Sequence, residues 1–377
     1  MKIQLHDNNL HLEFAPLSLT KPVALLRMGI LTFEERWEEN YPDAEFCFAT
    51  EKYLQVKYPQ HNNWDLSLPA NVIPNEDYVS VLNSMEDNTA LYQGETWLGM
   101  KGTGETILQY TGEEVVTITK RWHLFQKNHK AIQSDFDLIT AGVDSQNISE
   151  SVTVIGDRKL IFLEAGAKAE ACVLNTTDGP IYLGENAEIM EGSLVRGPFA
   201  LCDDSIIKMG AKIYGATTVG PNCKVGGEVD NSILQGYSNK GHDGYMGNSL
   251  IGEWCNLGAD TNTSNLKNNY GNIRTYSYST RQEVATDTQF MGLTMGDHSK
   301  CSINTMFNTA TVIGVSCNVY GGDFPQKFIS SFSWGGNEFV PFAFDKAIEA
   351  ANAMMSRRGL DLSVEDVQIL KNIAELK

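Results

Sequence analysis

The sequence predicts an α/β N-terminal domain, followed by a three-sided parallel β-helix and by C-terminal helices. Aliphatic residues recur at every sixth position through the middle of the chain. Gly and Asn occupy the turns between them, as expected where the backbone adopts left-handed angles. The first 120 residues lack this period and alternate strand-like with helix-like segments. Together these patterns indicate a small mixed domain joined to a solenoid.

The period of six is unbroken over eight repeats. Its aliphatic positions are Leu183, Ile189, Val195, Leu201, Ile207, Ile213, Val219 and Val225. Small residues follow four positions after most of them, as at Ala187, Ser193, Ser205, Ala211, Thr217 and Cys223. This period fits neither a 3.6-residue helix nor a two-residue strand alternation, but it fits a coil with three flat sides of about six residues each. The aliphatic side chains should therefore point into a narrow interior.

The pattern extends in both directions and is interrupted twice. An earlier run comprises Ile155, Ile161, Ala167 and Val173, and a later run comprises Met295, Cys301, Phe307, Ile313 and Val319. Residues 229–248 and 263–290 leave the period, so we expect loops or distorted coils that project from the solenoid. Loops on a rigid scaffold commonly carry function. A sandwich of short strands is the alternative fold, but it would not hold a fixed period.

The flanking regions are predicted from strand and helix patterns. Strands are expected at 2–5, 10–14, 44–50 and 70–73, and helices at 23–39 and 76–82, which gives a modest α/β domain over residues 1–120. Residues 121–150 should form a helical connector, and residues 151–337 the β-helix. In residues 338–377, one helix should end at Gly359, and Ser363 with Asp366 forms a capping-box start for another. We expect these helices to cap the open end of the solenoid.

Composition excludes several classes of protein. The formal net charge of −18 argues against nonspecific nucleic-acid binding, which needs Lys and Arg to displace counterions. No apolar run approaches the ~20 residues of a membrane span, and the first residues lack the apolar core of a signal peptide. The seven Cys are scattered without a CxxC pair, unlike a disulfide framework or a zinc ribbon. We therefore expect a cytoplasmic protein with no membrane partner.

One long stretch carries a family resemblance. Residues 239–271 contain a Gly-His-x-x-Tyr-x-Gly segment, an Ile-Gly-x-x-x-Asn-x-Gly-Ala coil and a later Asn, which fall on Gly241, His242, Tyr245, Gly247, Ile251, Gly252, Asn256, Ala259 and Asn265. This stretch resembles the acetyltransferase half of the bifunctional N-acetylglucosamine-1-phosphate uridylyltransferase/glucosamine-1-phosphate acetyltransferase family. The resemblance implies a left-handed β-helix of hexapeptide-repeat acyltransferase type. It also implies a homotrimer, with acetyl-CoA as co-substrate between neighbouring solenoids.

The N-terminal segment 16–37 looks like part of a sugar nucleotidyltransferase domain, with one departure. Enzymes of that kind have a Gly-x-Gly-Thr-Arg loop just before this point, whose backbone N–H groups hold nucleotide phosphates. Here residues 6–15 read HDNNLHLEFA and contain no Gly. Lys21 and Arg27 remain as candidate nucleotide-binding residues, and Mg²⁺ is expected only if this domain is active. The family's substrate-contacting Lys upstream of the catalytic His also has no counterpart.

The residues of the resemblance suit acyl transfer. The reaction needs a base for the acceptor's proton, donors for the oxyanion, and a groove that aligns two substrates. His242 is the candidate base, because an unperturbed imidazole pKa of ~6.5 lies near working pH. Alternatively, His242 is a structural residue whose ring nitrogens are hydrogen-bonded within the protein. The other candidates are Tyr245, Asn265, Arg196, Lys240 and Lys267 for the sugar or its phosphate, and Thr286 and Ser302 for acetyl-CoA.

A metal-dependent reaction is not expected in the solenoid. Zinc enzymes built on such coils need three His around the ion. Residues 151–337 contain only His242 and His298, in no His-rich spacing. His298 is expected to serve a turn or a subunit contact.

Three functions remain open at this point. The first is an acyl-CoA-dependent transferase, with acetyl as the expected acyl group, that acts on an amino sugar phosphate or a nucleotide sugar. The second is a sugar-1-phosphate nucleotidyltransferase in which the β-helix is a scaffold, and the third is a non-catalytic protein that binds sugar nucleotides. The missing Gly-rich loop speaks against the second. The intact set of His242, Tyr245 and Asn265 speaks against the third.

Overall fold

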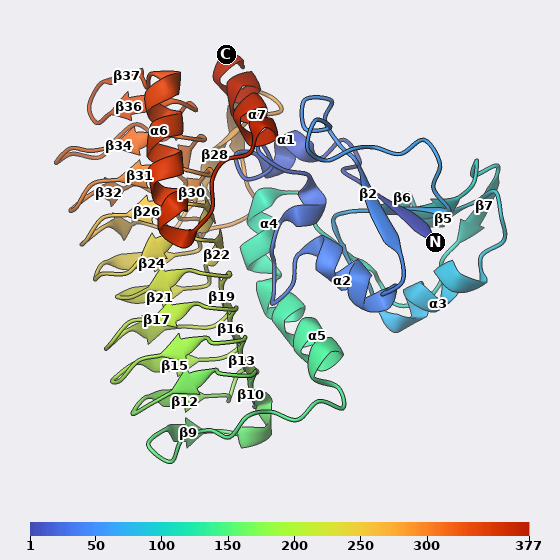
Figure 1. Ribbon diagram of the computed structural model, residues 1–377, viewed down its shortest axis with the longest axis horizontal. Helices are drawn as coiled ribbons and strands as arrows, with labels where there is room; N and C mark the ends of the chain where they lie inside the picture. The colour runs from blue at the N-terminus through green and yellow to red at the C-terminus, as the bar shows by residue number, and fades with distance from the viewer. Residues whose placement is uncertain (377) are drawn as a thin grey trace.

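The computed structural model describes residues 1–376 and has two main bodies, a tall β-solenoid and an α/β domain beside it (Figure 1). Helices α4 (Arg121–Gln126) and α5 (Asn128–Thr140) lie between them. The C-terminal helices accompany the last coils. The fold class predicted from the sequence is confirmed.

The N-terminal domain is built on a six-stranded sheet with the strand order β2-β1-β3-β6-β5-β7. Its strands are β1 (Lys2–His6), β2 (Glu45–Ala49), β3 (Leu66–Pro69), β5 (Thr89–Gln93), β6 (Thr96–Lys101) and β7 (Thr106–Gln109). β1 pairs in parallel with β2 and β3, whereas β6 runs antiparallel to β3. The remaining elements are β4 (Val72–Ile73), β8 (Val116–Thr117), α2 (Phe33–Asn40) and α3 (Glu76–Ser84).

Two predicted elements of this domain are wrong. Residues 10–14, expected as a strand, form the short helix α1 (His11–Phe14), and residues 23–39 divide into the 3-10 turn η1 (Val23–Leu25) and α2. Asn8 and Asn9 adopt left-handed angles (φ 51° and 59°), which turn the chain directly after β1. Asn tolerates this conformation better than other non-Gly residues, so it replaces the glycines that the loop lacks.

The solenoid has three faces of parallel strands, in sheets of nine, ten and eight strands. Face 1 comprises β10 (Ile161–Leu163), β13 (Ile181–Leu183), β16 (Phe199–Leu201), β19 (Thr217–Val219), β22 (Ile233–Gly236), β25 (Leu250–Glu253), β30 (Thr294–Met295), β33 (Val312–Ile313) and β35 (Phe328–Ile329). Face 2 comprises β11 (Lys168–Ala169), β14 (Glu188–Ile189), β17 (Ile206–Ile207), β20 (Lys224–Val225), β23 (Asn239–Lys240), β26 (Asn256–Leu257), β31 (Lys300–Cys301), β34 (Asn318–Val319), β36 (Ser333–Gly335) and the antiparallel β37 (Phe339–Pro341). Face 3 comprises β9 (Thr153–Ile155), β12 (Val173–Asn175), β15 (Leu194–Arg196), β18 (Lys212–Ile213), β21 (Glu228–Asp230), β24 (Tyr245–Gly247), β27 (Asn262–Thr263) and β32 (Met306–Phe307).

Strand register explains the period of six. Leu183 pairs with Leu201 and Leu201 with Val219, so one regular coil takes 18 residues, or six for each face. The periodic aliphatic side chains from Leu183 to Val225 are buried and stack into one continuous core. The earlier run departs from the prediction, because Ile155 is 46% exposed and Ala167 is only partly buried. All seven cysteines are free and buried, and Cys223, Cys255, Cys301 and Cys317 belong to this core. Burial raises the pKa of the Cys223 and Cys317 thiols to about 12.

The two interruptions of the period differ in structure. Residues 229–248 do not project, because β21, β22, β23 and β24 continue all three faces. Val219 pairs with Leu234, so this coil takes 15 residues instead of 18. Residues 263–290 do leave the solenoid and form the hairpin of β28 (Arg274–Ser277) and β29 (Gln282–Ala285). Arg121 of α4 donates hydrogen bonds to Thr275 and Tyr276 of this hairpin, which joins it to the connector.

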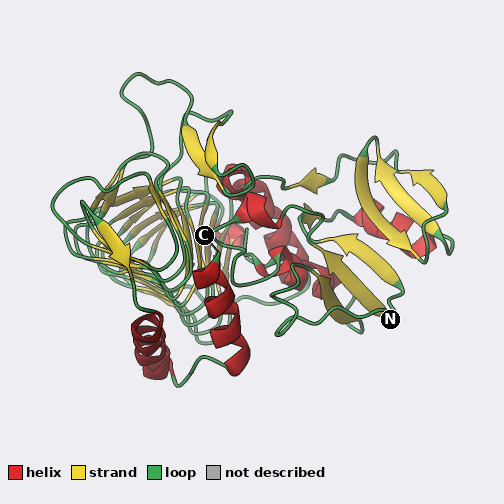
Figure 2. Cartoon of the chain, turned by 90° about the horizontal axis from the view of Figure 1, so that it is seen from above, coloured by secondary structure: helices red, strands yellow, loops and turns green. Residues whose placement is uncertain are grey.

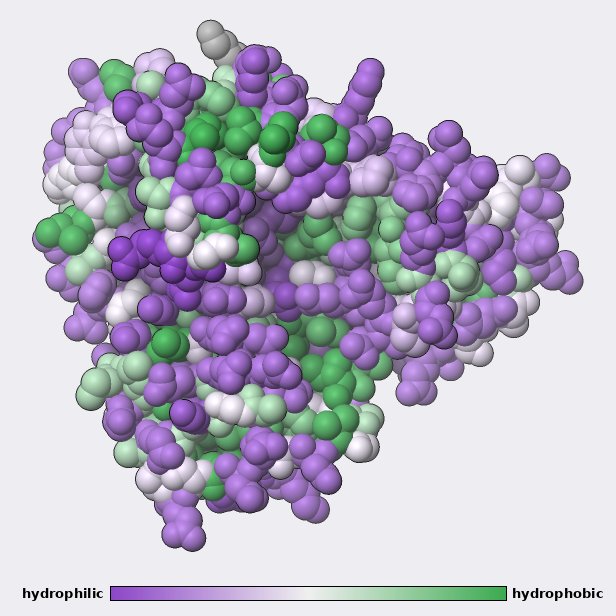
Figure 3. Space-filling view, in the orientation of Figure 1, coloured by the Kyte–Doolittle hydropathy of each residue, from purple (hydrophilic) through white to green (hydrophobic). Residues whose placement is uncertain are grey.

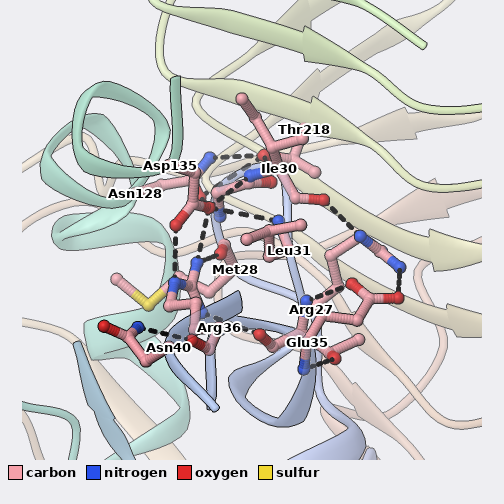
Figure 4. A network of polar contacts seen from close by, with 12 residues as sticks. Arg27, Met28, Ile30, Leu31, Glu35, Arg36, Asn40, Asn128, Asp135 and Thr218 are labelled. Atoms are coloured by element: carbon pink, nitrogen blue, oxygen red, sulfur yellow. Dashed lines mark hydrogen bonds and ion pairs between the residues drawn. The ribbon is translucent and has the colours of Figure 1, made fainter. Parts of the chain in front are cut away.

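A buried ion pair joins the N-terminal segment to the connector (Figure 4). Arg36 donates from Nε and Nη2 to the two oxygens of Asp135 at 2.6 and 2.7 Å, and both side chains are 1% exposed. Asp135 also accepts from the backbone N–H groups of Ile30 and Leu31. From the same helix α5, Asn128 donates to the carbonyl of Ala216 in the solenoid. This network fixes the positions of the segment, the connector and the coils.

The C-terminal helices lie beside the solenoid and do not cap its end (Figure 2). α6 (Phe344–Met355) is followed by the 3-10 turn η3 (Ser356–Arg358), and α7 (Val364–Glu375) begins at the predicted capping box of Ser363 and Asp366. Their apolar faces pack with Leu54 of the N-terminal domain and Val315 of the solenoid. Figure 3 shows apolar side chains gathered over α6, α7 and α5 on a mainly hydrophilic face. None of the described helices is long and apolar enough to span a bilayer.

Candidate active site

His242 lies at the end of a strand of face 2, in the turn between β23 and β24. Its side chain is exposed, and the structure gives its ring no hydrogen-bond partner among residues 1–376. It borders a cavity of about 480 Å³, which we call the His242 cavity. The other lining residues are Lys208, Lys224, Asn239, Gly241, Asn256, Leu257, Gly258, Ala259 and Ile303. Four of them, Gly241, Asn256, Gly258 and Ala259, belong to the sequence pattern described above.

Lys240 lies inside the solenoid, in contrast to the expectation that it meets a phosphate. It pairs with Val225 on face 2 and takes the place of a periodic aliphatic residue, with 1% of its surface exposed. Its ammonium donates to the carbonyls of Gly226, His242 and Asp243 at 3.2, 2.6 and 3.3 Å. Burial lowers the pKa of Lys240 to about 8, against the opposing effect of Asp243. Lys240 therefore fixes the turn that carries His242.

Replacing Lys240 with Met should remove a pH-dependent contribution to stability. The pKa of Lys240 is about 8 in the folded chain and 10.5 as the usual value. Between these values the unfolded chain still binds the proton that the folded chain has released, so the free energy of unfolding rises with pH. Below this window both states are protonated and the contribution is constant. Urea unfolding is measured below pH 8 and near pH 10.5, and the native protein should gain stability relative to Lys240→Met as the pH rises. A difference in unfolding free energy that does not change with pH would contradict the lowered pKa of Lys240.

Two cations in the His242 cavity were missed by the sequence reasoning. Lys208 follows β17 and Lys224 lies in β20, and among the described residues neither ammonium has an ion pair or a hydrogen bond. Lys224 pairs with Asn239 in the register of face 2, and Asn239 pairs with Asn256. The strand register could have identified Lys224 from the sequence, because it places Lys224 on face 2, from which the His242 turn begins. An unpaired cation bordering a cavity suits an anionic ligand.

Tyr245 and Asn265 are brought into direct contact. Asn265 Nδ2 donates to Tyr245 Oη at 3.0 Å and to Asn248 Oδ1 at 2.7 Å. Gly247 makes room for them, because a Cβ at that position would collide with Tyr245 Oη. Burial raises the pKa of Tyr245, and the carboxylate of Asp230 adds to the effect.

This cluster adjoins a cavity of its own. Asn248 borders a space of about 370 Å³, together with Gln126, His129, Gly215, Ala216, Asp230, Asn231 and Phe290. His242 comes just before β24 and Asn248 just after it, so the two cavities lie at opposite ends of that strand. Within residues 1–376, no hydrogen bond joins the cluster of Tyr245 and Asn265 to His242.

The remaining solenoid candidates occupy varied positions. Lys267 donates to the carbonyl of Asn272 at 2.8 Å in the projecting segment. The Arg196 guanidinium is exposed, 3.5 Å from a carboxylate oxygen of Asp178. Thr286 is buried, and its hydroxyl donates to the carbonyl of Ile273 at 2.9 Å. Ser302 directly precedes Ile303 of the His242 cavity, and its hydroxyl is 3.3 Å from that of Thr305.

The candidate nucleotide-binding residues Lys21 and Arg27 instead join the N-terminal domain to the solenoid. The Lys21 ammonium lies 2.6 Å from Glu253 and 3.0 Å from Asp297. Burial opposes its charge, yet these carboxylates raise the pKa of Lys21 above its usual value. Arg27 donates to Glu35 at 3.0 Å, and its backbone N–H donates to Gln235 of β22 at 2.7 Å. Both side chains are buried and paired with carboxylates, which leaves neither cation free for a phosphate in this structure.

The loop after β1 also differs from a phosphate-binding loop. Asp7 is 4% exposed, and one of its oxygens accepts from the backbone N–H of Val23 at 2.9 Å. Its other oxygen accepts from the Thr50 hydroxyl and lies 3.5 Å from His11. A buried carboxylate at this end of the sheet repels an incoming phosphate. Within residues 1–376, no three His, Cys, Asp or Glu side chains are grouped so as to hold a metal ion.

Comparisons with known proteins confirm the resemblance drawn from the sequence. Residues 3–144 match the family model described as sugar nucleotidyl transferase. The chain is 36% identical over 95 residues to the bifunctional protein GlmU of Trichormus variabilis, covering 23% of this chain and 21% of that protein. It is 26% identical over 161 residues to the bifunctional protein GlmU of Synechococcus elongatus, covering 41% and 31%. The matched stretches thus span between 21% and 31% of the length of these curated relatives.

Similar solved structures include two acyltransferases. The Arabidopsis UDP-N-acetylglucosamine acyltransferase is 15% identical, with a TM-score of 0.29, covering 58% of this chain and 86% of that chain. The polySia-specific acetyltransferase NeuO is 12% identical, with a TM-score of 0.30, covering 51% and 87%.

Proposed function

We propose that this protein is an acyl-CoA-dependent transferase, with acetyl-CoA as the donor. Its acceptor is an amino sugar phosphate or a nucleotide sugar, and His242 is the general base. One observation carries the proposal: an exposed imidazole borders a cavity of about 480 Å³ beside two lysines, and none of these three groups has a side-chain partner within residues 1–376. Lys208 and Lys224 supply positive charge for the acceptor's phosphate. The likeness to bifunctional GlmU proteins supports this choice of substrate class.

The residues of the cavity have distinct roles in the proposed reaction. Acetyl-CoA supplies the thioester, and the acceptor's amine or hydroxyl attacks its carbonyl carbon. His242 takes the acceptor's proton as the new bond forms, and returns it to the sulfur atom as the C–S bond breaks. Lys240 fixes the His242 turn, because its ammonium donates to the backbone carbonyl of His242. The lysines hold the acceptor, so that the attacking atom meets the thioester in one orientation.

The proposed assembly is a homotrimer in which a neighbouring solenoid closes the cavity. Two large apolar side chains at the cavity are left exposed in a single chain. Ile303, which lines the cavity, is 64% exposed, and Met209, which follows Lys208, is 70% exposed. Packing a second copy of the chain over them would bury apolar surface and exclude water from His242. Thr286 and Ser302 remain the proposed acetyl-CoA contacts.

A second candidate function is sugar-1-phosphate nucleotidyl transfer by the N-terminal domain, with Mg²⁺ as its metal. The family match over residues 3–144 favours it. The buried Asp7 and the pairing of Lys21 and Arg27 with carboxylates oppose it. We therefore rank acyl transfer first.

Parallel assays on the purified chain test the two functions. Acetyl-CoA is incubated with a panel of amino sugar phosphates and nucleotide-linked amino sugars, and the free thiol is followed. Separately, pyrophosphate release from UTP or dTTP is followed in the presence of sugar phosphates and Mg²⁺. We expect acceptor-dependent thiol release without pyrophosphate release. Pyrophosphate release without any thiol release would reverse the ranking.

A further inference from the structure

A second cavity lies beside the His242 cavity, and we call it the corner cavity. It has a volume of about 270 Å³ and is lined by Lys224, Tyr237, Asn239, Trp254, Met354, Arg357 and Arg358. It sits where face 1 turns into face 2, against the end of α6 and η3. Lys224 and Asn239 line both cavities. The two spaces therefore form one groove across the outside of face 2.

The corner cavity is cationic in an acidic chain. Lys224, Arg357 and Arg358 border it, and none of its lining residues is acidic. Within the described chain, Arg357 and Lys224 have no carboxylate ion-pair partner, although the protein as a whole carries a net charge of −18. Arg358 donates to the carbonyl of Asn222 at 3.1 Å, which fixes η3 against the coil. Among the described residues none of these three cations has an ion-pair partner, and such a group favours a ligand with more than one negative charge.

Two aromatic rings form one wall of this cavity. Tyr237 and Trp254 stack with their centroids 4.2 Å apart and an angle of 11° between the rings. Both residues have left-handed backbone angles, with φ of 52° and 59°. The same corner carries Asn186, Asp204 and Asn222 in the preceding coils, all with positive φ.

The choice of aromatic residues at this corner is not explained by the turn. Asn and Asp suit left-handed angles, whereas bulky residues in that conformation are strained and tend to cluster at functional sites. Trp254 is 6% exposed and packs the corner. Tyr237 is only half-buried and remains at the cavity, where its ring is available to a flat ligand. The side-chain oxygen of Asn239, between the two cavities, has no hydrogen-bond partner among the described residues.

We propose that the corner cavity binds a nucleoside diphosphate, with the base beside Tyr237 and the two phosphates on Lys224, Arg357 and Arg358. The group attached to the second phosphate then points along face 2 towards His242. Tyr237 and His242 lie on either side of β23 (Asn239–Lys240), so a ligand that reaches from one to the other has to be elongated. The orientation of the ligand towards His242 rests on the proposed function. The binding site does not, because it is inferred from the residues that line the corner cavity.

Two ligands share this chemistry. One is a nucleoside diphosphate sugar, whose sugar would be the acyl acceptor. The other is coenzyme A, whose adenosine and diphosphate would lie here while its thiol arm extends to His242. Either ligand would place an aromatic base and a diphosphate in the corner cavity. With the first the cavity would bind the acyl acceptor, and with the second it would bind the acyl donor.

Titration calorimetry on the full chain tests the proposal, with UDP, UDP-N-acetylglucosamine, coenzyme A and inorganic pyrophosphate as probes. Arg357→Gln is the main variant, because Arg357 is exposed and borders only the corner cavity. Losing one charge-assisted contact should weaken nucleotide binding roughly tenfold. Tyr237→Asn, which suits the left-handed corner, should weaken nucleotide binding and leave pyrophosphate binding unchanged. Lys168→Gln, an exposed lysine of face 2 at the start of the solenoid, is the matched control and should bind as the native chain does.

The outcomes separate the two ligands and the two proposals. If Arg357→Gln weakens UDP and UDP-N-acetylglucosamine alone, the cavity selects the acceptor; if it weakens coenzyme A alone, the cavity selects the donor. His242→Ala should bind the probes as tightly as the native chain, so a failure of the catalytic proposal would leave this result intact. The corner site is overturned if no nucleotide binds, if Arg357→Gln binds as the control does, or if Tyr237→Asn weakens pyrophosphate as much as UDP.

Discussion

Replacing His242 with Ala should lower the rate of thiol release by roughly 10²–10⁴-fold, which is the usual contribution of a general base. The acceptor's proton then has no base within the cavity, although both substrates still bind. Rates are measured as free thiol formed from acetyl-CoA with the acceptor found in the panel.

The design of this variant leaves the turn in place. Lys240 donates to the backbone carbonyl of residue 242, which Ala retains, so the loss of the ring does not release the loop. His129→Ala is the matched control, because His129 is also exposed and borders the cavity at the other end of β24. Activity that survives in His242→Ala but disappears in His129→Ala would move the reaction to that second cavity.

Replacing Asp135 with Ala should lower the free energy of unfolding by about 3–5 kcal/mol, because it leaves a buried charge without its partner. Arg36 would remain in an interior where it is 1% exposed. The backbone N–H groups of Ile30 and Leu31 would also lose their acceptor. Since these groups join the N-terminal segment to the connector, the chain should unfold at a lower denaturant concentration.

An exposed ion pair provides the control for this variant. The Arg196 and Asp178 side chains are 54% and 55% exposed and lie 3.5 Å apart. Exposed pairs contribute about 0–1 kcal/mol, so Asp178→Ala should unfold almost as the native chain does. Guanidinium unfolding followed by far-ultraviolet circular dichroism compares the two. Equal effects of the two substitutions would show that the Arg36–Asp135 pair does not stabilise the junction between the N-terminal segment and the connector.

The solenoid could be predicted because its regular coil length appears in the sequence as a constant spacing of aliphatic residues. Leu183, Leu201 and Val219 stack at one point of successive coils, so each contributes the same kind of side chain at a constant spacing. The coil after Val219 is shorter by three residues, and a lysine stands at one of its interior positions. Both changes break the period without breaking the solenoid. A pattern of aliphatic residues alone cannot distinguish such a coil from a projecting loop.

The candidate site was only partly accessible to sequence reasoning. The local motif singled out His242, Tyr245 and Asn265 as candidates, but the contact between Tyr245 and Asn265 appears only in the structure. Arg357 and Arg358 meet Lys224 only because a helix far along the chain returns to the corner of an earlier coil. Lys21 looked like a phosphate ligand because its carboxylate partners, Glu253 and Asp297, are distant in sequence. Local patterns carry no information on such contacts.

The burial of every cysteine affects how the enzyme assay can be read. Chromogenic disulfide reagents react with thiolates, and sulfhydryl groups that are enclosed and hard to ionise react slowly. The intact chain should therefore contribute little background colour, so that the signal reports coenzyme A released by turnover. A late rise in colour without acceptor would have another meaning, namely that the coils have opened and exposed their sulfur atoms.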